Sequence, residues 1–267
     1  MKILLIGDVV GSPGRHIMKK ALPRVFAKHD VEYCVANVEN AAGGFGVTKD
    51  ICDEILDMGV DCLTSGNHIW DKREILGVVD LIPQLLRPLN YPKGQPGQGS
   101  HVGVARRSKI KVATLNLSCR VFMHGALDDP FTLGLAEVKR LREETLVILV
   151  DIHGEATSEK GAIGHFLDGQ VSAVVGTHTH VPTCDHRVLP GGTAYCSDLG
   201  MTGPYDSVIG VEKDAIVKRF ITGMPTRFET AKGDPRLAAA VVDVDPQTGL
   251  ALGIERMLLS EDDLKTY

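Results

Sequence analysis

Aromatic residues are scarce in this chain: phenylalanine, tryptophan and tyrosine together make up 5% of its 267 residues. A run of about 20 apolar residues, the length that spans a bilayer, is also missing. The apolar opening, MKILLIGDVVG, stops at Gly7-Asp8, short of the apolar core and cleavage site that a signal peptide needs. These absences argue against a membrane or secreted protein, and we expect a cytoplasmic one.

Paired cysteines and an excess of basic residues are missing as well. The six cysteines are scattered without a CxxC pair, and several lie inside apolar runs, as small hydrophobic residues do. This pattern favours a reducing compartment over a disulfide scaffold. The formal net charge of −5 argues against stable binding of duplex nucleic acid. A phosphate-bearing substrate stays open, because bound cations outweigh distant side chains.

No Pro/Ser-rich linker, low-complexity tract, charge block or internal repeat divides the sequence. Its hydrophobic share of 43% is typical of a globular protein. We therefore expect residues 1–267 to form a single domain.

Short apolar runs alternate with helical patterns in the first third of the chain. Strands are predicted at residues 2–10, 32–38 and 61–65, and helices at 15–28, 48–58 and 72–81. Thr48 is suited to cap the second helix at its N-terminus. This βαβαβ alternation predicts parallel strands covered by helices.

The remainder mixes hairpins with further strand and helix patterns. Residues 86–99, rich in proline and glycine, are predicted to be a loop. The later elements are a hairpin of residues 101–105 and 109–117, helices at 133–144 and 160–167, and strands at 146–152 and 172–175. Turn signals at 190–192 and 245–249 predict two more hairpins. Two packed sheets flanked by helices fit this order.

Polar side chains follow five of the predicted strands. In α/β sheets the carboxyl ends of the strands converge on the ligand crevice. Each group alone has a simpler interpretation, such as a helix cap for Asp8 or a surface turn for Asn67-His68. Together they predict one site, formed by Asp8, Glu39, Asn40, Asn67, His68, His153, His178 and His180.

The chemistry of this set points to metal ions. Carboxylates, amides and imidazoles without a cysteine suit first-row divalent metals such as Mn, Fe or Zn. Two metals about 3.5–4 Å apart need a bridging ligand, and the two oxygens of Glu39 can provide one. On a strand His178 and His180 would share a face, whereas in a turn their directions stay open.

Several motifs carry a family resemblance. The order GD, acidic strand end, GNH, single histidine and GTHTH resembles the calcineurin-like metallophosphoesterases. The stretches MKILLIGDVVG, NVENAAGG, GNHIWD, DIHGEATSEK, VVGTHTHVPT and SDLGMTGP resemble their YmdB-like bacterial branch more closely, over nearly the whole chain. This resemblance implies a four-layer α/β/β/α sandwich of two mixed sheets flanked by helices.

The chain departs from the wider superfamily in three motifs. Asp8 is not followed by the histidine of an Asp-x-His motif, Glu39-Asn40 replaces an aspartate, and Ile69-Trp70 separates His68 from Asp71. The YmdB-like branch resembles this chain at all three places, so the departures point to that branch.

The resemblance also implies the roles of the site residues. Asp8, Glu39, Asn40 and His180 would hold one metal, and Glu39, Asn67, His153 and His178 the other. Fe or Mn is the expected metal, with Zn or Mg as alternatives. Two cations would lower the pKa of a bridging water, whose hydroxide attacks phosphorus. His68 would be the general acid that protonates the leaving alkoxide.

The function implied is hydrolysis of small phosphodiesters, with 2′,3′-cyclic nucleotides as the leading substrates. One alternative is a phosphomonoesterase or protein phosphatase with the same metals. Another is a regulatory protein that binds a nucleotide or RNA with little turnover. A homo-oligomer stays open, and no membrane partner is expected. Loops 43–47, 121–129 and 197–205 are predicted to line the pocket, with Phe45, Phe122 and Tyr205 as candidates for base stacking.

Overall fold

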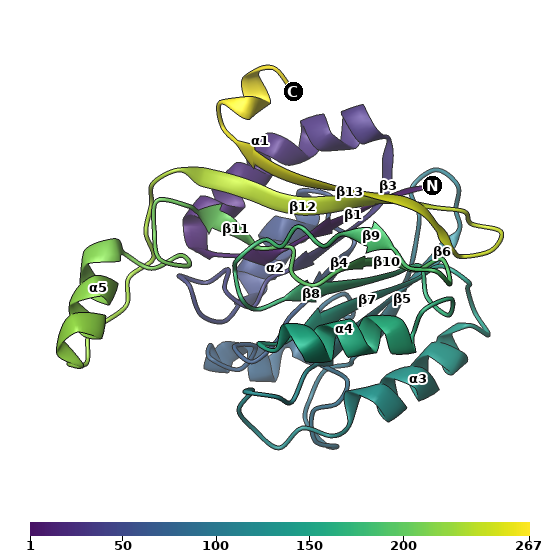
Figure 1. Ribbon diagram of the computed structural model, residues 1–267, viewed down its shortest axis with the longest axis horizontal. Coiled ribbons are helices and arrows are strands. Elements are labelled where there is room, and N and C mark those ends of the chain that lie inside the picture. The colour runs from purple at the N-terminus through teal and green to yellow at the C-terminus, as the bar shows by residue number, and fades with distance from the viewer.

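The first sheet combines the N-terminal and C-terminal strands of the chain (Figure 1). The computed structural model describes residues 1–267. Strands β1, β3 and β4 are parallel, and β12 joins β1 antiparallel. The order is β2-β11-β12-β1-β3-β4, with β13 also on β12. The bounds are β1 Lys2–Ile6, β2 Asp8–Val9, β3 Val31–Asn37, β4 Cys62–Thr64, β11 Met201–Pro204, β12 Pro235–Val244 and β13 Ala251–Ser260.

The second sheet is built from the middle of the chain. Strands β6, β7, β8 and β10 are parallel, and antiparallel β5 and β9 form its two edges. The order is β5-β6-β7-β8-β10-β9. The bounds are β5 Ser100–Val104, β6 Lys111–Ser118, β7 Ile148–His153, β8 Ala173–Thr177, β9 Arg187–Val188 and β10 Ala194–Cys196.

Helices cover the outer face of each sheet. Helices α1 (Gly11–His29) and α2 (Lys49–Asp57) contribute to the core on the first sheet, and α3 (Pro130–Leu141) and α4 (Thr157–Phe166) to that on the second. Figure 1 shows α1 on one side of the stacked sheets and α3 and α4 on the other. The predicted four-layer α/β/β/α sandwich is confirmed.

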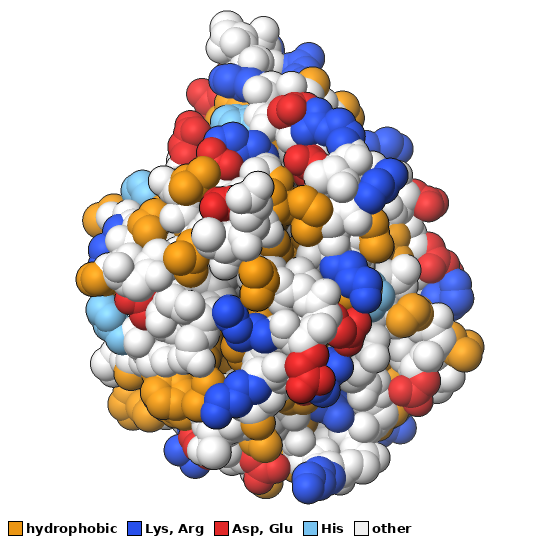
Figure 2. Space-filling model, turned by 90° about the vertical axis from the view of Figure 1, so that its right-hand side faces the viewer, with side chains coloured by type: hydrophobic (Ala, Val, Ile, Leu, Met, Phe, Trp, Pro, Cys, Tyr) orange, Lys and Arg blue, Asp and Glu red, His pale blue; other side chains and the backbone are white.

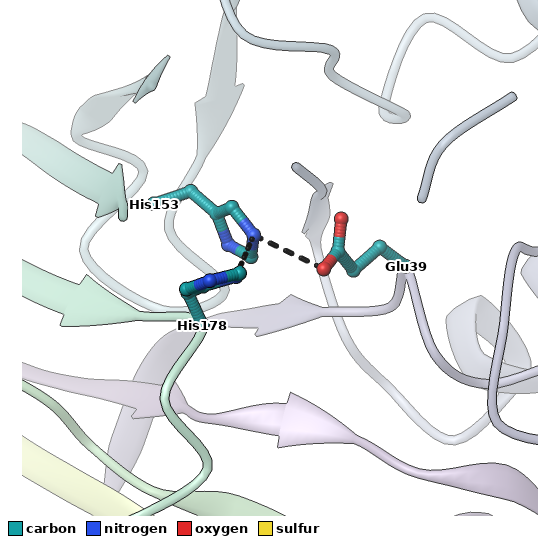
Figure 3. A group of neighbouring side chains, drawn as sticks. All are labelled: Glu39, His153 and His178. Carbon is teal, nitrogen blue, oxygen red and sulfur yellow. Dashed lines mark hydrogen bonds and ion pairs between the residues drawn. The ribbon is translucent and has the colours of Figure 1, made fainter. Parts of the chain in front are cut away.

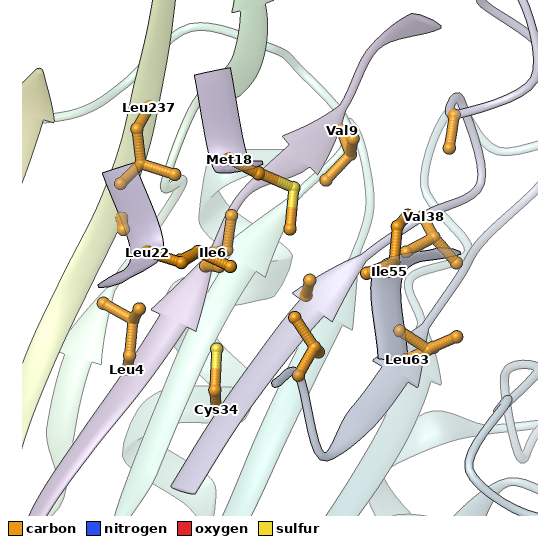
Figure 4. Close-up of a cluster of buried hydrophobic side chains, with 14 of the residues drawn as sticks. Leu4, Ile6, Val9, Met18, Leu22, Cys34, Val38, Ile55, Leu63 and Leu237 are labelled. Atoms are coloured by element: carbon orange, nitrogen blue, oxygen red, sulfur yellow. The ribbon is translucent and has the colours of Figure 1, made fainter. Parts of the chain in front are cut away.

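Alternation along β1 shows how the sequence specifies these layers. Leu4 and Ile6 point toward α1 and α2 and join the outer core of the first sheet (Figure 4). Ile3 and Leu5 point the other way, into a core that includes side chains of both sheets. Successive side chains of a strand face opposite sides, so a continuously apolar strand is buried on both. The assignment of residues 1–267 to one domain stays a prediction.

Several predicted elements are confirmed and several need correction. The parallel βαβαβ unit is present, Thr48 caps α2 by accepting from the backbone N–H of Ile51, and the three hairpins form. The predicted helix at 72–81 is wrong: two short 3₁₀ segments, η1 (Arg73–Gly77) and η2 (Val79–Leu81), replace it. Gly77 and β-branched Val78 and Val79 disfavour a continuous α-helix there.

The predicted strand 2–10 is interrupted at Gly7, which separates β1 from β2. A Cβ at Gly7 would lie 1.8 Å from the carbonyl oxygen of Gly200, so only glycine allows the chains to approach this closely. Helix α5 (Lys213–Thr222), which projects from the body in Figure 1, and the short η3 (Asp263–Lys265) were not predicted. No helix combines the length and apolarity needed to cross a bilayer.

Candidate metal centre

The predicted site residues come from the carboxyl ends of strands in both sheets. Glu39 follows β3 and Asn67 follows β4 in the first sheet, whereas His153 ends β7 and His178 follows β8 in the second. Figure 3 shows the side chains of Glu39, His153 and His178 pointing toward one another across this junction. The convergence follows from parallel strands that end at the same edge of the stacked sheets.

Three acceptor atoms surround one ring nitrogen of His153. Its Nε2 lies 3.0 Å from Oε1 of Glu39, 2.9 Å from Oδ1 of Asn67 and 3.1 Å from Nδ1 of His178. A single N–H proton cannot serve all three with good geometry. This excess of lone pairs is the environment that a divalent cation satisfies, so the donor set fits a metal.

A buried hydrogen-bond chain fixes the orientation of the His153 ring. The Thr177 hydroxyl donates its one proton to Oδ1 of Asp151 at 2.7 Å, so it accepts from Nδ1 of His153 at 3.0 Å. Neutral His153 therefore carries its proton on Nδ1 and turns the lone pair of Nε2 toward Glu39. Such partners of a metal-binding histidine set its tautomer and its basicity.

Charges in this pocket are strongly coupled. Burial raises the pKa of Glu39, but the charge and hydrogen bond of His153 outweigh burial and lower the pKa to about 2. Burial lowers the pKa of His153, yet Glu39 and then Asp8 raise it to about 9. Burial and the charge of His153 lower the pKa of His178 to about 3. Without a metal, a proton on His153 balances the buried carboxylate.

His178 presents its other nitrogen to an acidic residue that sequence reasoning missed. Its Nε2 lies 3.3 Å from Oε2 of Glu155, whereas its Nδ1 lies 3.1 Å from Nε2 of His153. Glu155 follows His153-Gly154 directly in the motif DIHGEATSEK, and this position could have marked it as a residue near the site.

A second group of donors lies beside the first. Nδ1 of His180 donates to the carbonyl oxygen of Ile209 at 2.8 Å, so neutral His180 carries its lone pair on Nε2. That nitrogen lies 3.4 Å from Oδ1 of Asn40, whose amide is held by a 2.9 Å bond to the Gly44 carbonyl. Two lone pairs facing each other also fit a cation.

Asp8 completes this second group from β2. Its carboxylate accepts from the backbone N–H of His178 at 3.1 Å. Burial raises the pKa of Asp8 to about 6, although the charges of His180 and His153 oppose the rise. Four of the seven predicted ligand residues thus meet around Nε2 of His153, Asn40 and His180 face each other, and Asp8 contacts the backbone of His178.

The turn that presents the two histidines is conformationally strained. His178 and His180 have φ values of 102° and 64°, so neither lies on a strand and the strand-face argument does not apply. Between them, the backbone N–H and hydroxyl of Thr179 donate to Asp198 at 3.1 and 2.8 Å. Asp198 is in turn paired with buried Lys160 at 2.9 Å. This ion pair, which sequence reasoning missed, anchors the turn.

His68 lies at the edge of the pocket without joining either donor group. Its backbone N–H donates to Oε2 of Glu39 at 2.8 Å, and its Nδ1 lies 2.8 Å from Oδ2 of Asp71. Phe45 packs edge-on against the ring, with centroids 4.9 Å apart. The Ile69-Trp70 insertion thus places Asp71 where it can orient the His68 imidazole.

The motif GNHIWD begins with a glycine, Gly66, because no side chain fits at this position. A Cβ on this residue would lie 2.1 Å from Cδ2 and 2.2 Å from Nε2 of His153. Only glycine lets the His153 ring pack against this turn, and the same turn delivers Asn67 and His68.

A cavity of about 630 Å³ opens beside these groups and extends to α5. Phe45 lines it, as predicted, but Phe122 and Tyr205 do not. Loop 121–129 instead borders a separate cavity of about 330 Å³ that includes Asn67, and no residue of 197–205 lines the larger cavity. Sequence reasoning missed the wall that α5 and the residues on either side of it provide: Val208, Ile209, Ile216, Arg219, Phe220, Phe228 and Glu229.

Known proteins resemble this chain over its whole length. A 2′,3′-cyclic-nucleotide 2′-phosphodiesterase of Bacillus subtilis (strain 168) is 46% identical over 264 residues, 99% of each chain. The structure of a novel phosphatase from Mycoplasma pneumoniae is 32% identical, with a TM-score of 0.90 over 99% of this chain and 96% of that one.

A more distant structure shows the fold alone. The 5′-nucleotidase of Candida albicans SC5314 is 12% identical, with a TM-score of 0.57 over 99% of this chain and 52% of that one. The calcineurin-like phosphoesterase architecture implied by the sequence is thereby confirmed. The family model described as YmdB-like protein matches residues 4–257. The chain therefore belongs to the YmdB-like protein family.

Proposed function

We propose that this protein is a metal-dependent phosphodiesterase that hydrolyses 2′,3′-cyclic nucleotides. The observation that carries the proposal is the convergence of Glu39, Asn67 and His178 on Nε2 of His153, beside a cavity of about 630 Å³ that Glu39 and His178 line. The 46% identity to a 2′,3′-cyclic-nucleotide 2′-phosphodiesterase supports this substrate class.

Two divalent cations would be held by the two donor groups. Glu39, Asn67, His153 and His178 would bind one, and Asp8, Asn40 and His180 the other, with Glu39 shared between them. Fe or Mn suits this mixture of carboxylate, amide and imidazole, and Zn or Mg is the alternative. When bound, the cations would neutralise phosphate oxygens and lower the pKa of a water nucleophile.

The protein's own groups would then direct the leaving oxygen. Water adds to phosphorus while the bond from phosphorus to O2′ breaks, and His68 donates the proton that O2′ needs. The Asp71 carboxylate accepts from Nδ1 of His68 and so orients the ring, with Nε2 left to donate toward the cavity that His68 lines. The 3′-phosphate is the product.

A phosphomonoesterase is the second candidate, because the similar Mycoplasma pneumoniae structure is described as a phosphatase. Metal-loaded protein assayed on a 2′,3′-cyclic nucleotide, a nucleoside monophosphate and a phosphopeptide separates the two. We expect turnover mainly of the cyclic nucleotide, abolished by chelator. Preference for a monoester or phosphopeptide would contradict the proposal.

The role of His68 can be tested through the leaving group. In His68→Ala the rate on the cyclic nucleotide should fall about 10²–10⁴-fold, because an alkoxide needs protonation. The loss should be far smaller on a nitrophenyl ester, whose phenolate leaves without help. Asn67→Ala, by contrast, should weaken a metal, and excess metal should partly restore both rates. Equal losses of kcat on both substrates for His68→Ala would reject the general-acid role.

A further inference from the structure

The cavity beside the donor groups is lined by aromatic residues that have no role in the proposed reaction at phosphorus. Only seven phenylalanines occur in the chain, and three of them, Phe45, Phe220 and Phe228, line this one cavity. Phe45 packs on His68, whereas Phe220 and Phe228 come from α5 and the segment after it. Aromatic side chains are thus concentrated where a substrate would extend away from the metal ligands.

Phe220 is uncovered by the protein itself. Its side chain is 80% exposed although Ile216, one turn earlier on α5, is buried. Covering an exposed ring on a cavity wall removes apolar surface from water, which is favourable in free energy. A ligand with a flat or apolar surface at this end, and its phosphate at the other, would cover this ring.

Arg219 adds a directional polar group to this wall. Its guanidinium lies over the Phe228 ring, 4.7 Å from the centroid, and it forms no ion pair with any carboxylate. A guanidinium presents several N–H donors in one plane and can bond two acceptors on one edge of a planar ligand. Guanine offers such a pair in O6 and N7.

We propose that α5 and Phe228 form the nucleobase subsite of this enzyme. The base lies against Phe220 and Phe228, and Arg219 donates to acceptor atoms on its edge. The cavity volume of about 630 Å³ lies within the range of about 300–1,000 Å³ usual for small-molecule sites, so it has room for a nucleotide. The inference rests on the proposed function for the position of the phosphate, and it adds which residues recognise the rest of the substrate.

Equilibrium binding tests the subsite without requiring turnover. Calorimetry with metal-loaded protein compares guanosine 3′-phosphate with ribose 3-phosphate, which lacks the base. We expect the nucleotide to bind more tightly to the wild type. Alanine at Phe220 or at Phe228 should weaken nucleotide binding about 5–150-fold, the usual effect of removing a stacked aromatic. Binding of ribose phosphate should change much less.

Matched control variants come from the same helix. Ile221 is 79% exposed and Lys218 is also exposed, and neither lines the cavity. Ile221→Ala should bind the nucleotide like the wild type. Lys218→Ala, the control for Arg219→Ala, should also bind it like the wild type. Phe228→Tyr, which keeps the ring, should restore most of the affinity that Phe228→Ala loses. Equal effects of Phe220→Ala and Ile221→Ala would overturn the subsite.

Failure of the subsite and failure of the proposed function give different results. Wild-type protein that hydrolyses cyclic nucleotides but binds both probes equally would overturn the subsite alone. Preference for the nucleotide that depends on Phe220 and Phe228, without hydrolysis of any cyclic nucleotide, would support the subsite and reject the proposed function.

Discussion

At the scale of single residues, the site depends on hydroxyl and amide groups that never touch a substrate. Thr177 is the clearest case, because its one proton goes to Asp151 and so dictates which nitrogen of His153 carries a hydrogen. The orientation of the His153 imidazole is therefore set by Asp151, which lies two hydrogen bonds away.

Replacing Thr177 tests this role. Thr177→Val keeps the shape but removes the acceptor for Nδ1–H of His153. We expect metal affinity to fall about 10–100-fold, measured by competition with a fluorescent chelator. Thr177→Ser keeps the hydroxyl and should bind metal nearly as the wild type does. Unchanged affinity in Thr177→Val would show that the ring is held by other contacts.

Metal affinity should also depend on pH. The pKa of His153 in the metal-free protein is about 9. Below that pH an entering cation must displace the proton on His153, so affinity should rise with pH by up to about tenfold per unit and level off near pH 9. Dissociation constants measured between about pH 6.5 and pH 9 check this slope. A constant value over the range would contradict displacement of that proton.

At the scale of elements, the turn after β8 is held from α4. Lys160 on this helix is almost fully buried and pairs with Asp198, which accepts from Thr179 between the two strained histidines. A left-handed φ at a non-glycine residue costs on the order of 1–3 kcal/mol and persists only where the surroundings enforce it. The ion pair is a large part of that enforcement.

The substitution Lys160→Met should therefore destabilise the folded protein. It leaves the buried Asp198 carboxylate without its counter-charge, and we expect a loss of about 3–5 kcal/mol in the free energy of unfolding. Urea titration measures it. Lys213→Met removes an exposed pair with Asp206 and serves as the control, with little change expected. Similar small losses in both variants would mean that Asp198 is stabilised by its other donors alone.

Element prediction succeeded where local signals and packing agree. The apolar alternation of β1 and the cap at Thr48 specify their elements locally, and both predictions are confirmed. Residues 72–81 have helical spacing, but Gly77 and the two valines after it favour 3₁₀ turns. Helix α5 carries apolar residues at helical spacing, Ile216, Val217, Phe220 and Ile221, but only Ile216 is buried, and sequence reasoning missed this pattern.

At the scale of the molecule, the candidate site joins the two sheets. Glu39 and Asn67 come from the first sheet, and His153 and His178 from the second. Sequence reasoning could assemble these residues because parallel strands end at one edge. It could not find Lys160 with Asp198, or Arg219 with Phe228, because those contacts arise from packing between segments with no shared motif.

One face of the molecule carries side chains of mixed charge. On the face at the right of Figure 1, Lys and Arg alternate with Asp and Glu, and no large patch of one sign gathers there (Figure 2). The expectation that duplex nucleic acid is not stably bound stays a prediction. The number of chains in the assembly stays a prediction.

Metal binding at the candidate site should stabilise the whole molecule, because the candidate ligands come from both sheets. A ligand at about 100 times its dissociation constant adds about 2.7 kcal/mol to the free energy of unfolding. We therefore expect chelator to lower the midpoint of thermal unfolding, and added metal to raise it again. Glu39→Gln, which removes the shared carboxylate charge, should make the midpoint much less responsive to metal. Equal midpoints with and without metal in the wild type would argue against a link between the sheets.

The proton shared by His153 and Glu39 bears on the order in which the protein is assembled. Because this proton already compensates the buried carboxylate, the chain need not capture an ion in order to fold. We therefore expect the site to form before a metal binds, and the same folded site to accept either Mn or Fe. Protein refolded in chelator and then supplied with Mn or Fe should match protein that was never unfolded, in both affinity and turnover.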